Sequence, residues 1–154
     1  MPNKYNYNID PDISKAETLP SSFYKDSYVF EDIKSKIFLK SWQWIGDTKL
    51  VPKKNYVHPL TVLNNYLSEP VVLSRTDENE IICLTNVCTH RGNIMVLEPG
   101  EMKKLVCTYH GRRFDNEGNF EYMPEFKDAK NFPRPCDNLH NFPLIKWGEL
   151  LFIG

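Results

Sequence analysis

Apolar residues near the start of the chain recur at the spacing of an amphipathic helix. Phe30, Ile33, Ile37 and Phe38 fall on one side of a helical wheel, with lysines elsewhere on the wheel. This spacing predicts a helix over about residues 28–40. Residues 1–20 are polar and interrupted by prolines, which predicts an extended arm before the helix.

Beyond the helix, the pattern changes to short apolar runs separated by turn-forming residues, which is typical of strands. The runs are Trp42–Ile45, Val71–Leu73, Ile81–Leu84, Leu105–Val106, Arg113–Phe114, Phe120–Tyr122, Leu144–Ile145 and Leu150–Phe152. The polar segments 76–79 and 115–119 each separate two runs and predict hairpins. We therefore expect a mainly β fold, an antiparallel sandwich or barrel over residues 46–154, preceded by an arm and helix over residues 1–45.

Composition limits the function classes that this chain can serve. With 154 residues the chain can bury one proper core, and its net charge of −1 offers no basic surface for nucleic acid. The apolar runs span only a few residues, too few to cross a bilayer, and the N-terminus lacks the apolar centre of a secretion signal. We expect a cytoplasmic protein that contacts neither nucleic acid nor membrane.

Two short pairs of soft metal ligands carry the clearest chemistry in the sequence. One is Cys88-Thr89-His90 and the other is Cys107-Thr108-Tyr109-His110, with Gly92 and Gly111 closely following the histidines. Each pair offers one thiolate and one imidazole. Two thiolates on one iron and two imidazoles on the other form the ligand set of a Rieske-type 2Fe–2S cluster. Each pair follows a predicted strand, so two ligand loops are expected to meet at the tip of the sheet.

A structural zinc module is the alternative that uses the same four residues, since two thiolates and two imidazoles also satisfy tetrahedral zinc. Zinc modules usually place like ligands together, as two cysteines in one motif and two histidines in another. Here Cys88 stands beside His90, and Cys107 beside His110. Mixed pairs favour the binuclear cluster, and zinc stays as an alternative.

The remaining cysteines and histidines are not expected to bind metal. Cys83 lies in an apolar run and is interpreted as a small buried hydrophobe. Cys136 follows Pro135 in a predicted loop and receives no role. His58 and His140 are predicted to lie in polar or proline-flanked loops. Without an export signal, the cysteines are expected to be reduced rather than paired in disulfides.

The two motifs resemble those of the Rieske domain in the large (alpha) subunit of ring-hydroxylating oxygenases. The resemblance lies in Asn86–Gly92 and Val106–Gly111, and it extends to Leu19–Tyr24, Ile37–Gln43, Phe114–Gly118, Trp147-Gly148 and Leu151–Ile153. It covers most of residues 19–154. It implies a Rieske-type β sandwich or barrel with two cluster-binding loops and one 2Fe–2S cluster per chain, in an electron-transfer domain.

The resemblance also implies the roles of the four ligands and the partners. Cys88 and Cys107 would hold the buried ferric iron, and His90 and His110 the outer iron that changes valence. Electrons would arrive from a reductase or ferredoxin and leave for a mononuclear iron in a catalytic domain, within mono- or dioxygenases that usually form trimers. A stand-alone Rieske ferredoxin-like carrier is the alternative.

The mononuclear iron of that family requires two histidines and one carboxylate. After His110 the only histidine is His140, so we expect that iron only in a domain absent from this sequence. The substrate pocket would lie in the same absent domain. Residues Leu19–Tyr24 and Trp42–Gly46 slightly resemble enzymes that act on quaternary amines, and aromatic substrates are equally compatible.

Some positions depart from the family pattern. Arg112 stands where the family commonly has tryptophan, which is expected to alter either packing under the cluster or a docking surface together with Arg91. Respiratory Rieske proteins carry a disulfide between positions that correspond to Asn93 and Tyr109. They also donate hydrogen bonds to the cluster from a serine and a tyrosine at the positions of Arg112 and Phe114.

We predict a low reduction potential from these departures. Arg112 and Phe114 cannot supply the two hydroxyl groups, and fewer hydrogen bonds to sulfur stabilise the reduced state less. The midpoint is expected in the lower part of the Rieske span, which reaches down to roughly −150 mV. A redox titration followed by visible absorption measures it. A midpoint near the upper end, roughly +300 mV, would contradict this prediction.

Overall fold

The computed structural model describes residues 7–154, so the first six residues of the predicted arm lie outside the described residues. The chain divides into two compact units, one that ends at Lys40 and one that comprises Ser41–Gly154. No helix in the described part of the chain is long and apolar enough to cross a membrane.

The first unit contains the predicted amphipathic helix, α2, which covers Ser27–Lys36. Its N-terminus is capped by Asp26, whose carboxylate accepts a hydrogen bond from the Tyr28 N–H (2.8 Å). The helix is shorter than predicted because its last turn tightens: the Lys40 N–H bonds to the Ile37 carbonyl (3.0 Å).

Two short helical segments accompany α2. The 3₁₀ turn η1 covers Phe38–Lys40, and the five-residue helix α1 covers Ser21–Lys25. The sequence pattern did not predict α1, which is too short to show an apolar period. Most of the apolar side chains that define the period of α2 are exposed, and Val29 is its one buried residue.

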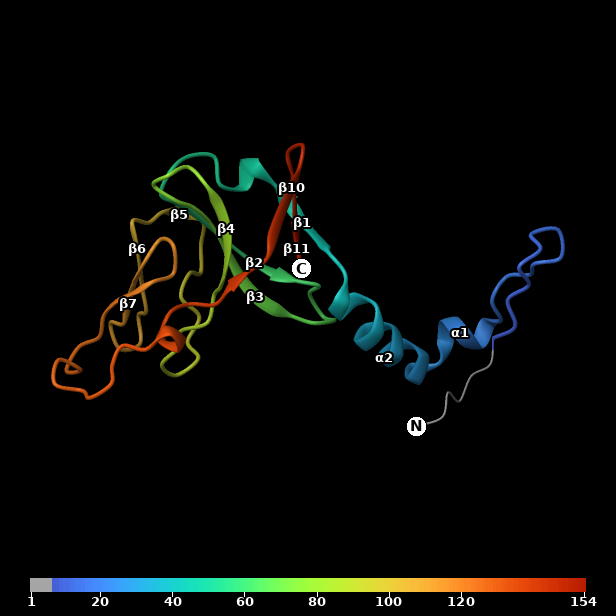
Figure 1. Ribbon diagram of the computed structural model, residues 1–154, viewed down its shortest axis with the longest axis horizontal. Helices are drawn as coiled ribbons and strands as arrows, with labels where there is room; N and C mark the ends of the chain where they lie inside the picture. The colour runs from blue at the N-terminus through green and yellow to red at the C-terminus, as the bar shows by residue number, and fades with distance from the viewer. Residues whose placement is uncertain (1–6) are drawn as a thin grey trace. The chain divides into compact units, whose positions relative to one another are not determined.

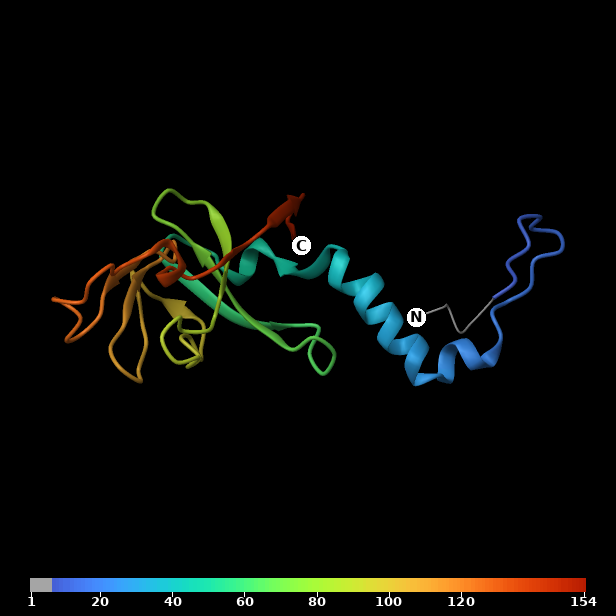
Figure 2. The ribbon, with the colours of Figure 1, turned by 60° about the horizontal axis from the view of Figure 1, so that its bottom comes forward.

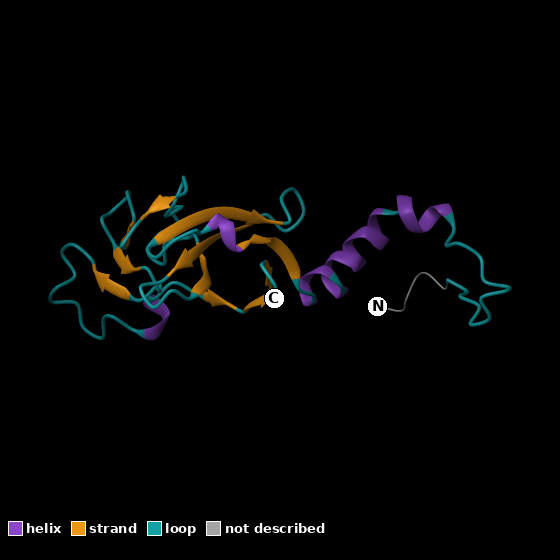
Figure 3. Ribbon diagram, turned by 90° about the horizontal axis from the view of Figure 1, so that it is seen from above, coloured by secondary structure: helices purple, strands orange, loops and turns teal. Residues whose placement is uncertain are grey.

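The second unit consists of three antiparallel sheets, which confirms the predicted mainly β, antiparallel fold (Figures 1 and 3). The first sheet has the order β1–β11–β10, with β1 at Gln43–Asp47, β10 at Leu144–Trp147 and β11 at Leu150–Ile153. The second has the order β5–β2–β3–β4–β9, at Gly100–Glu101, Tyr56–Val62, Glu69–Arg75, Ile81–Thr85 and Asn141–Phe142. The third has the order β6–β7–β8, at Lys104–Val106, Arg113–Asp115 and Phe120–Tyr122.

Short 3₁₀ turns and one long loop complete the second unit. The turns are η2 at Thr48–Leu50 and η3 at Pro135–Asp137. Figure 2 shows the segment between β8 and β9 extending past the β6–β8 sheet before it returns to the five-stranded sheet. Both predicted hairpins are present, as β3–β4 and β7–β8.

Strand β2 is the longest strand that the sequence did not predict, and the two-residue strands β5 and β9 were missed as well. Strand β2 pairs with β3 along its whole length, and His58 lies opposite Leu73, so the placement of His58 in a loop was wrong. Pro59 interrupts the strand pattern because proline cannot donate to a ladder. It is tolerated here because β2 pairs with β5 only through Tyr56 and Val57, so Pro59 has a neighbouring strand on one side only.

The five-stranded sheet separates two hydrophobic cores. Side chains alternate along β3 and β4, so Val72 and Leu84 enter one core while Leu73 and Cys83 enter the other. The first core includes Cys88 and Cys107. The second includes side chains of the β1–β11–β10 sheet, such as Leu151 of β11. The ligand loops therefore rest on a core that is distinct from the one behind β10 and β11.

We predict that matched truncations in the two cores separate their roles. Leu73→Ala and Leu84→Ala each remove a fully buried side chain and are expected to lower the free energy of unfolding by about 2–5 kcal/mol. Only Leu84→Ala is expected to speed amide exchange in residues 88–93 and 107–112, because Leu84 packs in the core beneath those loops. Denaturant titration and hydrogen exchange measure the two effects. Equal exchange in both variants would contradict the separation of the cores.

Candidate metal centre

The two ligand loops share one backbone frame. Residues 88–93 are closed by the antiparallel bridge Val87–Ile94, and residues 107–112 by the pair Val106–Arg113 of strands β6 and β7. In each loop the cysteine N–H donates to the carbonyl five residues later, with Cys88 to Asn93 and Cys107 to Arg112 both at 2.8 Å. The predicted positions of both loops, directly beyond paired strands, are confirmed.

A glycine at the equivalent position, four residues after the cysteine, closes each loop. The Gly92 N–H donates to the Cys88 carbonyl (3.0 Å), and the Gly111 N–H to the Cys107 carbonyl (2.9 Å). Both glycines have left-handed backbones, with φ of 72° and 73°, where a β-carbon would be strained. The frames therefore match residue for residue, and the loops differ in placing the histidine two or three residues after the cysteine.

A buried asparagine attaches the first loop to the five-stranded sheet. The Asn86 side chain donates to the Val96 carbonyl (2.8 Å) and accepts from the Val96 N–H (2.8 Å), and its own N–H donates to the Pro70 carbonyl (3.0 Å). These bonds hold the ascending and returning segments of the loop together. The second loop needs no such clamp because the β6–β7 ladder closes it.

The loops bring the two thiols together beneath the surface. Cys88 and Cys107 are each 2% exposed and free, and their thiols lie within hydrogen-bonding reach of each other. The Asn93 side-chain amide reaches across from the first loop to the Cys107 Sγ atom (3.6 Å). Asn93 thus links the loops at a position where respiratory Rieske proteins carry a disulfide cysteine.

The two imidazoles form a second pair nearer the surface. The His90 and His110 rings lie 4.9 Å apart between centroids, at an interplanar angle of 73°. The Nδ1 atom of His90 is buried and makes no hydrogen bond within the described part of the chain. Buried polar atoms usually have a hydrogen-bond partner, so an unpartnered ring nitrogen at this position fits a metal-ligating imidazole.

The local environment prepares these donors for metal. Burial raises the pKa of the Cys107 thiol, but N–H groups of Tyr109 and His110 more than offset burial, so the pKa is lowered. Burial raises the pKa of the Cys88 thiol. The pKa of His90 is lowered, first by burial and then by His110 and nearby arginines, which favours the neutral ring that binds metal.

The donors fit a binuclear cluster better than one zinc ion. Tetrahedral zinc needs all four donors within about 2.0–2.3 Å of a single point. Here the thiols of Cys88 and Cys107 meet each other, and the His90 and His110 rings meet each other. A thiol pair and an imidazole pair instead match two irons that each take two protein ligands and share bridging sulfides.

Arg112 does not belong to a docking surface. It is 3% exposed, and its guanidinium Nη2 atom donates to the Asp137 carboxylate (2.8 Å) and to the Asp137 carbonyl (3.1 Å). The docking role considered for Arg112 was therefore wrong, and the packing role is confirmed. Arg91 is exposed, so its docking role stays a prediction.

Asp137 is the functional neighbour that sequence reasoning missed. Besides Arg112, its carbonyl accepts from the Thr89 hydroxyl (2.8 Å), so one residue of η3 contacts both ligand loops. Burial alone would raise the pKa of Asp137, but its bonds to Arg112 and to the Arg134 N–H outweigh burial. The pKa is therefore lowered, which favours the ionised carboxylate. Apart from Arg134, the partners of Asp137 are Arg112 and Thr89, which lie 25 and 48 residues away, so no local pattern places Asp137 beside the ligand loops.

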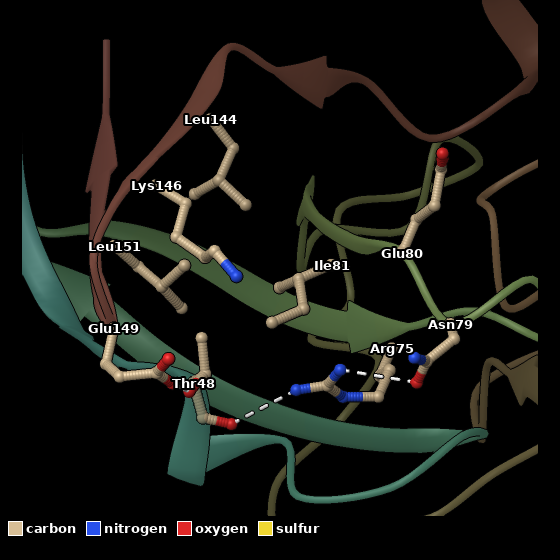
Figure 4. Close-up of a pocket in the computed structure, with 9 residues that line it drawn as sticks. All are labelled: Thr48, Arg75, Asn79, Glu80, Ile81, Leu144, Lys146, Glu149 and Leu151. Carbon is tan, nitrogen blue, oxygen red and sulfur yellow. Dashed lines mark hydrogen bonds between the residues drawn. The ribbon is translucent and has the colours of Figure 1, made fainter.

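A pocket lies between the five-stranded sheet and the β10–β11 hairpin, away from the ligand loops (Figure 4). It encloses about 480 Å³ and is lined by Thr48, Arg75, Asn79, Glu80, Ile81, Leu144, Lys146, Glu149 and Leu151. The Arg75 guanidinium is bound to the Val51 carbonyl (2.6 Å), the Thr48 carbonyl (3.4 Å) and the Asn79 side chain (3.3 Å). None of these residues belongs to the ligand loops, so the pocket is separate from the metal centre.

Comparison with known proteins gives a consistent result. Residues 41–133 match the Rieske [2Fe-2S] domain. The carnitine monooxygenase oxygenase subunit of Escherichia coli (strain K12) is 30% identical over 142 residues, which are 91% of this chain and 37% of that subunit. The methanesulfonate monooxygenase hydroxylase subunit alpha of Methylosulfonomonas methylovora is 28% identical over 157 residues, covering 94% of this chain and 37% of that subunit.

A solved structure shows the same fold. A quaternary ammonium Rieske monooxygenase in complex with its substrate L-carnitine superposes with a TM-score of 0.80 at 25% identity, covering 90% of this chain and 38% of that one. The chain therefore spans little more than a third of the length of these relatives.

The four cysteines are predicted to differ in reactivity. Burial raises the pKa of Cys83 to about 12, so its thiol stays protonated and covered at pH 8, whereas Cys136 is exposed. Brief alkylation of the folded, metal-free chain should label Cys136 alone. After unfolding in guanidinium, all four cysteines should be labelled. Mass spectrometry counts the labels, and Cys136→Ser should take up none while folded. Labelling of Cys83 as fast as Cys136 would contradict its burial.

Proposed function

The chain belongs to the Rieske [2Fe-2S] domain family, and on that premise we propose that it relays single electrons from a reductase or ferredoxin to a mononuclear iron in a separate catalytic domain of an oxygenase. The observation that carries this proposal is the matched pair of loops, which places two thiols together and two imidazoles together. That pairing suits a cluster whose two irons have different ligands.

We assign the ligands from this pairing. The Cys88 and Cys107 thiolates would hold one iron and the His90 and His110 imidazoles the other, with the buried Nδ1 as the ligating atom of His90. When bound, the cluster takes up and releases one electron at a time. The N–H groups of Tyr109 and His110 and the Asn93 amide stabilise negative charge on the Cys107 sulfur.

The histidine side of the centre is the face through which electrons would leave. The Tyr109 ring is exposed and stacks on His110 with centroids 3.8 Å apart, and Phe126 contacts the His90 ring at 6.1 Å. The distal ring N–H groups of the histidines would donate to a carboxylate of the acceptor domain, and the exposed Arg91 beside them would assist docking.

An oxygenase role is favoured over a stand-alone carrier by the extent of the likeness. The relatives named above match 91–94% of this chain, so the match includes residues before the Rieske domain itself. The α2 unit lies in that region, and a minimal carrier does not need it. We therefore place this chain with oxygenase alpha subunits, in which a catalytic domain, from the same or a neighbouring subunit of a trimer, would accept the electron.

Ligand substitutions test this proposal. His90→Ala and Cys107→Ser are expected to abolish the thiolate-to-iron absorption and the EPR signal of the reduced protein, because each removes a ligand that no neighbour can replace. His140→Ala is the matched control: His140 is exposed in the loop before β9, and this variant should keep both signals. An intact Rieske spectrum in His90→Ala would overturn the ligand assignment, and a colourless wild-type protein with one zinc would overturn the function.

A further inference from the structure

A buried ion pair lies directly behind the ligand loops. Arg112 and Asp137 are 3% and 6% exposed, and the Arg112 Nη2 and Asp137 Oδ1 atoms lie 2.8 Å apart. Arg112 immediately follows the glycine that closes the second loop, and Asp137 bonds through its carbonyl to Thr89 of the first loop. The pair therefore contacts both loops without supplying a metal ligand.

Aromatic rings shield this pair from water. The Arg112 guanidinium carbon lies 4.9 Å from the centroid of Phe120 and 5.6 Å from those of Phe114 and Phe132. These contacts hold the guanidinium plane in place and lower the local dielectric constant. The Arg112 Nε atom is also buried and makes no hydrogen bond within the described residues, so the cation is only partly compensated.

Arg112 is bonded to both ligand loops. Its carbonyl accepts the Cys107 N–H (2.8 Å), and its Nη2 atom donates to the Asp137 carbonyl (3.1 Å), which also accepts the Thr89 hydroxyl (2.8 Å). Thr89 stands between Cys88 and His90, the proposed ligands of different irons. Exposed arginines at the loop tips are screened by solvent, whereas the shielded Arg112 is not.

We propose that the Arg112–Asp137 pair sets the reduction potential of the cluster through two opposing buried charges. Reduction adds one negative charge to the centre. The guanidinium favours the reduced state, and the carboxylate favours the oxidised state and holds the guanidinium in place. This inference rests on the proposed function, because it requires a cluster between the loops.

The two charges predict shifts of opposite sign. Arg112→Met leaves the Asp137 carboxylate, which still accepts the Arg134 N–H (2.7 Å) and lies 3.5 Å from the Arg134 guanidinium, so it stays ionised at pH 8. That variant is expected to lower the equilibrium constant for reduction by roughly tenfold or more. For one electron, each tenfold change lowers the midpoint potential by about 59 mV. Asp137→Asn keeps the shape and leaves the cation, so it is expected to raise the midpoint.

A purely structural role would not produce this pattern. Loosened loops would admit water in both variants and would move both midpoints in the same direction. The double variant Arg112→Met/Asp137→Asn is therefore expected to return towards the wild-type midpoint, since both charges are gone. Arg112→Lys keeps the charge and should stay within a few-fold of the wild-type equilibrium.

An exposed ion pair on the neighbouring strands provides the control. Arg113 and Glu121 pair at 3.0 Å between Nε and Oε2 with exposures of 45% and 25%, and Arg113 is adjacent to Arg112 in sequence. Arg113→Met and Glu121→Gln are expected to leave the midpoint nearly unchanged, because solvent screens both charges.

The experiment is a spectroelectrochemical titration of the cluster-loaded protein at pH 8 and constant salt, with cluster content measured first. A wild-type protein without a cluster would overturn the proposed function. A loaded wild-type protein whose two single variants shift in the same direction, or not at all, would overturn this inference alone. If Asp137→Asn retains no cluster, the comparison of Arg112→Lys with Arg112→Met decides: equal downward shifts would exclude the charge effect, and a shift only in Arg112→Met would support it.

Discussion

The backbone hydrogen bonds that close the two ligand loops are the constraint on which the rest of the site depends. The cysteine N–H bonds to the carbonyl five residues ahead, and the glycine N–H returns to the cysteine carbonyl, in the same way at Cys88 and at Cys107. These bonds fix where each side chain leaves the backbone before any metal binds. Because the frames match, the thiols meet beneath the surface and the imidazoles meet above them.

The surrounding fold holds these loops rigid from three sides. The β6–β7 ladder closes the second loop, Asn86 clamps the first to the five-stranded sheet, and Asp137 bonds to both through Thr89 and Arg112. Removing one partner of a buried ion pair typically costs roughly 3–5 kcal/mol, because the other charge is left uncompensated. Arg112, in place of the tryptophan that the family commonly has, therefore brings a charge into this site as well as bulk.

The sequence predicted those features that depend on local spacing. The mixed ligand pairs, the helix around Phe30–Ile33 and the two hairpins follow from short-range patterns, and the structure contains all of these elements. Strand β2 was missed because Pro59 breaks its pattern, and Asp137 was missed because its partners are distant in sequence. The burial of Arg112 could not be predicted, since it depends on phenylalanines from three separate segments.

The central claim is that one binuclear cluster lies between the loops with unlike ligands on its two irons. Mössbauer spectroscopy of the oxidised protein loaded with iron-57 tests it most directly. The account predicts two doublets of equal area with different isomer shifts, one from the thiolate-bound iron and one from the imidazole-bound iron. A single doublet, or a folded protein that binds one zinc ion and no iron, would contradict it.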